Sequence, residues 1–158
     1  MGAVRLAAIA TALLFAAIAA YLAPLSPSVI ELQMAATPAA FGAIVHTWPP
    51  EHLARFRNHL PADCLLLVAY STLGVLLARR AALFAALAPA LRRAATWVLP
   101  AAALFDAGEN ALHWWLTEVP RFGVPLPYAL AAGAAAMKWL LLLAFVLLAV
   151  VALARRRD

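Results

Sequence analysis

Four polar side chains interrupt an otherwise apolar stretch in the second half of the chain. Asp106, Glu109, Asn110 and His113 stand at positions i, i+3, i+4 and i+7. On an α-helix this spacing places them on one face, within an arc of about 100°. A carboxylic acid that burial keeps neutral, one turn from an imidazole, can act as a general acid and base. Asp106, Glu109 and His113 are therefore candidate catalytic residues.

Other polar residues stand within the neighbouring apolar segments. Asp63 and Tyr70 are seven residues apart and share a helical stripe, and Lys138 lies within the last apolar run. A charged side chain at the centre of a bilayer costs at least about 2.5 kcal/mol, so such residues face protein or water and mark functional sites by default. We expect Asp63, Tyr70, Asn110 and Lys138 to bind a ligand.

A metal site is a second interpretation of the same residues. Glu109 and His113 at i and i+4, together with Asp106 and Asp63, could supply carboxylate and imidazole ligands. The paired Glu-x-x-His pattern of di-iron bundles is absent, and the single cysteine, Cys64, excludes a cysteine-rich metal site. No strong cofactor motif is present, so the cofactor is unknown from the sequence, and a metal ion is one that these residues could bind.

Composition determines the class of protein. Of the 158 residues, 67% are hydrophobic and only 12% are charged, whereas soluble domains have about 25% charged residues. Alternation at strand spacing does not recur, which favours helices over a β-barrel. The sequence predicts an all-α integral membrane protein: one domain, a bundle of four transmembrane helices with a short helical cap outside the cytoplasm.

The apolar runs and prolines predict the boundaries of this single membrane domain, residues 1–158. The predicted spans cover residues 4–23, 61–78, 94–116 and 128–153. Residues 24–60 form the outside cap, 79–93 a cytoplasmic loop and 117–127 an outside loop. Within the cap, Thr37 as N-cap and Pro38 as first residue predict a short helix to Trp48. A second short helix from Glu51 to Leu60 is expected to lie along the membrane surface.

The basic residues predict the orientation. In the four-span arrangement eight arginines lie on one side and three on the other. The larger group is Arg5, Arg79, Arg80, Arg92, Arg93, Arg155, Arg156 and Arg157; the smaller is Arg55, Arg57 and Arg121. The positive-inside rule then places both termini in the cytoplasm of a multi-pass protein of the cell inner membrane. This topology accounts for the net charge of +5, so nucleic-acid binding is not expected.

The same topology predicts that the polar residues meet. At 1.5 Å per residue, Tyr70, Asp106 and Lys138 should each lie about 15 Å below the outer surface, and Asp63 and His113 nearer to it. We expect a polar pocket between the second, third and fourth spans that opens outward. His113 and Asp63 would form its mouth, Glu109 and Asn110 its wall, and His59 could join the mouth.

Several of these segments resemble a group of small bacterial four-helix membrane proteins of uncharacterised function. The resemblance rests on Leu60-Pro-Ala-Asp63 leading to Ala69-Tyr70, and on Phe105-Asp106-Ala-Gly-Glu109-Asn110 after Leu99-Pro100. The group carries an Asp-x-x-Glu-Asn signature on its third helix and an Asp and a Tyr on its second. The resemblance covers about residues 30–116 and implies the four-helix architecture, without an activity.

Two functions follow as hypotheses. In the first, the polar pocket in the outer half of the bilayer binds an amphipathic small molecule or lipid. This hypothesis includes the case in which the protein also transforms the bound molecule chemically. In the alternative, the chain is a non-catalytic accessory subunit that packs against other membrane subunits of a larger complex. Its polar residues would then be hydrogen-bond glue between helices, worth about 0.6 kcal/mol per bond.

Overall fold

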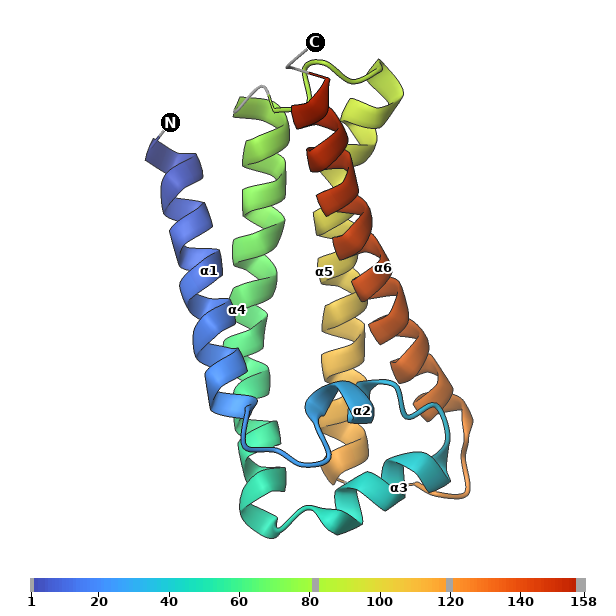
Figure 1. Ribbon diagram of the computed structural model, residues 1–158. Helices are drawn as coiled ribbons and strands as arrows, with labels where there is room; N and C mark the ends of the chain where they lie inside the picture. Colours follow the sequence, from blue (N-terminus) through green and yellow to red (C-terminus); the bar gives the residue numbers. More distant parts are fainter. Residues whose placement is uncertain (1, 81–82, 119–120, 156–158) are drawn as a thin grey trace.

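The computed structural model describes residues 2–80, 83–118 and 121–155, and within them every regular element is a helix. The helices in chain order are α1 (Gly2–Leu22), α2 (Val29–Gln33), α3 (Pro38–Thr47), α4 (Pro50–Arg80), α5 (Pro89–Glu118) and α6 (Leu126–Ala154). The four long helices run side by side, and α2 and α3 cross one end of them (Figure 1). The all-α prediction is confirmed.

The long helices pack in chain order. α1 packs along α4, α4 along α5, and α5 along α6. Among the described residues α1 and α6 do not pack extensively against each other, so the four helices do not close into a ring. The start of α1 and the end of α6 lie at the same end of the molecule, opposite α2 and α3 (Figure 1).

Three helices are long and apolar enough to cross a membrane: α1, α4 and α6. The sequence interpretation expected a fourth span at 94–116. The corresponding helix, α5, has ample length at 30 residues but is not among the three found in the described chain. Its Arg92, Arg93, Asp106 and Glu109 lower its apolar character.

The cap begins with two short helices whose N-termini are capped by side chains. Thr37 Oγ1 accepts a hydrogen bond from the Ala40 amide at 3.2 Å, and Pro38 is the first residue of α3, as predicted. α2 was not predicted. Ser28 and Glu31 form a capping box there, in which Ser28 N and Oγ donate to Glu31 Oε2 at 2.7 and 2.8 Å. These hydrogen bonds, the backbone one first, hold the pKa of the Glu31 carboxyl below its usual range.

The expected separate helix from Glu51 to Leu60 is wrong. α4 begins at Pro50 and continues through Pro61 to Arg80 without interruption. A proline inside a helix removes one hydrogen bond and usually kinks or ends the helix. Here Phe56 and Leu60 are buried in the cap, and Leu66 and Leu67 are buried further along. Packing on both sides of Pro61 therefore maintains one helix.

Two apolar clusters lie at different levels of the bundle. The first joins the cap to the helix ends beside it and includes Leu32, Phe41, Trp48, Phe56, Leu116 and Tyr128. The second lies toward the other end and includes Leu67, Phe84, Leu99, Ala102 and Phe145. Along α5, the buried polar residues 106–113 fall between the two clusters. The polar residues therefore form a layer between two apolar ones.

Gly74 allows α4 and α5 to approach closely beside this layer. A Cβ atom at Gly74 would lie 2.8 Å from Leu99 Cβ and 2.9 Å from Leu99 Cδ1. Contacts this short are repulsive, and Leu99 is itself buried. The helix spacing that positions α5 against α4 therefore depends on the missing side chain.

Candidate functional site

The polar stripe of α5 faces the interior, as its spacing predicted. Asp106, Glu109, Asn110 and His113 are all buried, on the same face as Ala102 and Leu99. Glu109 is 0% exposed and His113 is 2% exposed. The side chains of Asp106, Glu109 and Asn110 therefore meet α4 and α6, and their partners on other helices belong to those two.

Lys138 of α6 lies between two carboxylates of α5. Its Nζ donates to Asp106 Oδ1 at 3.0 Å and lies 2.6 Å from Glu109 Oε2. Lys138 is 5% exposed, and it is the only lysine in the chain. A buried ammonium needs such partners because its desolvation is costly. Two buried acids and one buried base therefore share a single site.

α4 contributes two further polar contacts. Tyr70 Oη donates to Asp106 Oδ2 at 3.2 Å, so each oxygen of Asp106 accepts one hydrogen bond. Asn110 Nδ2 donates to Asp63 Oδ2 at 2.6 Å. The structure thus brings together Asp63 and Tyr70 of α4, Asp106 and Asn110 of α5, and Lys138 of α6.

His113 does not lie at a mouth, contrary to the expectation. Its Nδ1 is 3.5 Å from Glu109 Oε1. Its ring is stacked on Phe41 of the cap at 6.2 Å and meets the edge of Phe56 at 5.8 Å between centroids. α3 therefore covers it. The burial of His113 beneath Phe41 was not predicted. Phe41 belongs to α3, and no local sequence pattern indicates where α3 lies relative to α5.

The residues proposed as metal ligands do not converge as a ligand set. Within the described residues, no group of three or more His, Cys, Asp or Glu side chains is arranged to hold a metal ion. The Lys138 ammonium already occupies the place between Asp106 and Glu109 that would attract a cation. Asp63 instead pairs with Asn110.

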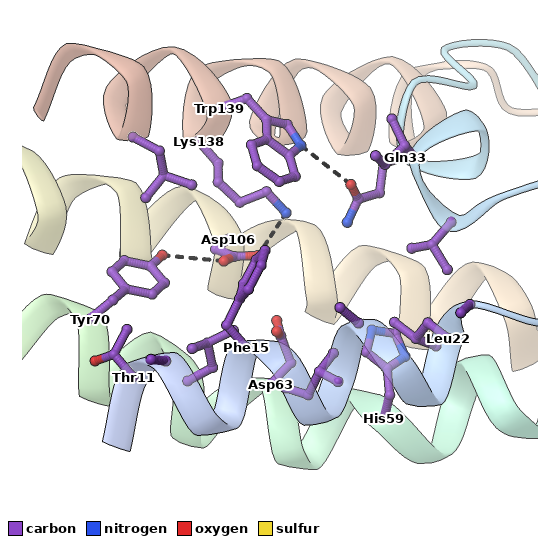
Figure 2. A pocket seen from close by; sticks show the side chains of 18 of the residues that line it. Thr11, Phe15, Leu22, Gln33, His59, Asp63, Tyr70, Asp106, Lys138 and Trp139 are labelled. Carbon is purple, nitrogen blue, oxygen red and sulfur yellow. Dashed lines mark hydrogen bonds and ion pairs between the residues drawn. The ribbon is translucent and has the colours of Figure 1, made fainter. Parts of the chain in front are cut away.

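A cavity of about 660 Å³ adjoins this polar layer. It is lined by residues of α1, α2, α4, α5 and α6, so it is not the expected pocket between the second, third and fourth spans alone. Figure 2 shows α1 on one side of it and Lys138 and Trp139 of α6 on the other. Its polar lining residues are Thr11, Ser28, Gln33, His59, Asp63, Tyr70, Asp106, Lys138 and Trp139.

The cavity divides the predicted site residues into two groups. Asp63, Tyr70, Asp106 and Lys138 line it, whereas Glu109, Asn110 and His113 are buried outside its lining. Of the three candidate catalytic residues, only Asp106 therefore reaches the cavity.

The sequence interpretation did not assign the first helix to the site. α1 lines the cavity with residues spaced by three or four, Ala8, Thr11, Ala12, Phe15, Ile18, Ala19 and Leu22. Nearly all of α1 is apolar, so neither face is marked by residue type. The hydrogen bond from Trp139 Nε1 to Gln33 Oε1, at 3.4 Å, was likewise not foreseen, because α2 was not predicted.

Comparison with known proteins adds no relative. The chain matches no protein-family model, and no curated protein and no solved structure is significantly similar to it. The geometry of the site is therefore the basis for the function proposed below.

Proposed function

We propose that this chain is a multi-pass membrane protein that binds an amphipathic small molecule or lipid in the cavity beside Asp63, Asp106 and Lys138. The observation that carries the proposal is the form of the cavity. One wall is the apolar face of α1, and the opposite wall carries charged side chains in the polar layer. An amphiphile needs both kinds of wall, one for its apolar chain and one for its polar head group. The volume of the cavity, about 660 Å³, lies within the 300–1,000 Å³ of ordinary ligand sites.

In this proposal α5 is a fourth span. Its acids face α4 and α6 and are paired there, so lipid would meet its apolar outer face, which includes Leu104 and Phe105. A 30-residue helix is about 45 Å long, enough to cross a hydrocarbon core of about 30 Å. The packing of α5 against both α4 and α6 supports this arrangement.

The proposed orientation follows from the arginines. Arg5, Arg79, Arg80, Arg92, Arg93 and Arg155 belong to the end of the molecule opposite the cap, and Arg55, Arg57 and Arg121 to the cap end (Figure 1). The positive-inside rule assigns the first group to the cytoplasm. The cap, and the polar layer beneath it, would then lie toward the outside of the inner membrane.

The ligand would reach the cavity sideways from the bilayer. Because α1 and α6 do not pack extensively in the described chain, residues of both helices line the cavity, including Phe15 and Leu142. An amphiphile in the membrane could pass between these helices without leaving the hydrocarbon. Binding, and not catalysis, is the function proposed, because Glu109 and His113 are buried away from the cavity.

The test introduces a bulky side chain on α1 that would occupy the cavity. Ala12 lines the cavity, and Ala16, one turn further along α1, does not; both are exposed in the isolated chain. Native mass spectrometry of the protein extracted from membranes should show a co-purified amphiphile in the wild type and in Ala16→Trp, and its loss in Ala12→Trp. Equal ligand content in the two variants would contradict the proposal. A ligand-free protein that co-purifies with a larger membrane complex would favour the accessory-subunit alternative.

A further inference from the structure

The hydrogen-bond donors on the polar wall of the cavity are largely used within the protein. Lys138 Nζ lies 3.0 Å from Asp106 Oδ1 and 2.6 Å from Glu109 Oε2. Tyr70 Oη donates to Asp106 at 3.2 Å. Trp139 Nε1 is directed to Gln33 Oε1 at 3.4 Å. Among the described residues that line the cavity, the Gln33 amide NH₂ and, on α1, the Thr11 hydroxyl are uncharged donors without an assigned partner.

Two acceptors at the same wall remain available. Asn110 donates to Asp63 Oδ2, and no donor from the described residues is assigned to Asp63 Oδ1. His59 Nδ1 bonds to the carbonyl oxygen of Phe56. A carbonyl only accepts, so Nδ1 carries the proton and Nε2 of the neutral ring is an acceptor. His59 is 5% exposed and lines the cavity, and no donor within the described chain reaches its Nε2.

The two acceptors are neighbours on α4 that do not interact with each other. His59 and Asp63 stand one turn apart on α4, and both point into the cavity (Figure 2). No ion pair within 4.0 Å joins them in the described structure. Neither side chain uses the other, so both can accept hydrogen bonds from a group bound in the cavity.

The charges favour the same kind of group. Three carboxylates, Asp63, Asp106 and Glu109, belong to the polar layer, and Lys138 is the one ammonium among the described residues there. The two carboxylates of Asp106 and Glu109 already outnumber the single positive charge of Lys138, so an anionic head group would be repelled by the polar layer even though one Lys138 N–H remains. A cation beside Asp63 meets a carboxylate that has only an amide partner.

We infer that the ligand is an amphiphile with a protonated primary amine, whose N–H groups bind between Asp63 and His59 while its alkyl chain lies against α1. This inference rests on the proposed function and specifies its ligand. The same chemistry could come from a single-chain lipophilic amine or from the amine of phosphatidylethanolamine. Phe15 and Leu142 line the apolar part that would hold the chain in either case.

The experiment compares probes of one chain length. The full chain in a neutral detergent is titrated with dodecylamine, dodecyltrimethylammonium and dodecyl sulfate at pH 7, and bound probe is counted by native mass spectrometry. We expect dodecylamine to bind at least about tenfold more tightly than either of the others. The trimethyl probe keeps the charge but has no N–H donor, so it separates the charge from the hydrogen bonds.

Variants test the assigned residues. Asp63→Asn should weaken dodecylamine binding by about tenfold or more, and Asp63→Glu should recover most of it. Glu51→Gln, an exposed acid at the start of the same helix, is the matched control and should leave binding unchanged. Thermal melting of each variant establishes that it is folded, and Asp63→Glu keeps the test valid if Asp63→Asn does not fold.

The outcomes separate the inference from the proposed function. Preferred binding of dodecyl sulfate, or unchanged dodecylamine binding in folded Asp63→Asn, would overturn the amine assignment and leave an amphiphile site in place. Equal binding of the trimethyl probe would overturn the hydrogen-bonding role of His59 and Asp63. If none of the three probes binds, both proposals fail. Titration with phosphatidylethanolamine and phosphatidylcholine identifies the source: preferential, Asp63-dependent retention of phosphatidylethanolamine assigns the amine to the lipid.

Discussion

Asn110 Nδ2 donates a 2.6 Å hydrogen bond to Asp63 Oδ2, which connects the middle of α5 to α4 at the level of the cavity. The acceptor is a carboxylate, and the donor is 7% exposed. The same contact serves the fold and presents Asp63 to the cavity.

Replacing Asn110 by alanine should therefore lower stability. Interhelical hydrogen bonds in membrane bundles contribute about 0.6 kcal/mol on average and up to about 1.7, and we expect a loss of about 1 kcal/mol in Asn110→Ala. Asn58→Ala is the control, because Asn58 is exposed on α4. Thermal or denaturant unfolding in detergent measures both. Equal stability of the two variants would show that the Asp63 contact contributes nothing.

Lys138→Met should be far more damaging. It leaves the buried carboxylates of Asp106 and Glu109 without the ammonium that lies between them. Removing one partner of a buried ion pair costs about 3–5 kcal/mol. The triple variant Lys138→Met, Asp106→Asn, Glu109→Gln should recover part of this loss because it removes the unpaired charges. A Lys138→Met protein with wild-type unfolding would contradict the assigned pairing.

Gly74→Ala tests the close approach of α4 and α5. The added methyl group would meet Leu99 at 2.8 Å, and overpacking of this kind costs about 1–3 kcal/mol. Gly133→Ala is the matched control in α6, because nothing lies within 4 Å of its Cβ position. Alanine favours a helix over glycine by up to about 1 kcal/mol, so this control should be neutral or more stable. The order of the two melting temperatures is the readout.

The capping box of α2 should give the fold a pH-dependent contribution. Because folding lowers the pKa of the Glu31 carboxyl, its ionised form stabilises the folded state above the ordinary pKa, and this contribution is lost as pH falls through the lowered value. Wild type should therefore melt higher than Glu31→Gln at neutral pH, with a difference that disappears in acid. In a Ser28→Ala background the pH-dependent difference between Glu31 and Glu31→Gln should become smaller but remain, because the backbone N–H of residue 28 can still donate to the Glu31 carboxylate. Parallel melting curves across the whole pH range would contradict this assignment.

Helical spacing made much of the fold and of the site predictable. The i, i+3, i+4, i+7 stripe from Asp106 to His113 is buried, and the Thr37 cap starts α3. Both features are local, so residue type and spacing determine them. The topology placed Asp106 and Lys138 at the same depth, and the structure pairs them across α5 and α6.

The features that the sequence did not reveal depend on packing between distant segments. α4 continues through Pro61 because the cap buries Phe56 and Leu60, and His113 is covered by Phe41. The role of α1 in the cavity depends on its packing against α4 and on its separation from α6, and its uniform composition gives no sign of either. The number of membrane spans was not determined by the sequence either, because α5 combines apolar and charged residues.

Photolabelling of α1 tests the central claim, ligand binding in the cavity, most directly. The protein in membranes is labelled with a dodecyl amphiphile that carries a diazirine in its chain, and the modified residues are mapped by mass spectrometry. The account predicts labels on the helical stripe that lines the cavity, Ala8, Ala12, Phe15 and Ala19, which excess unlabelled amphiphile suppresses. Labels spread evenly over α1, with Leu13 and Ala16 modified as strongly and without competition, would contradict it.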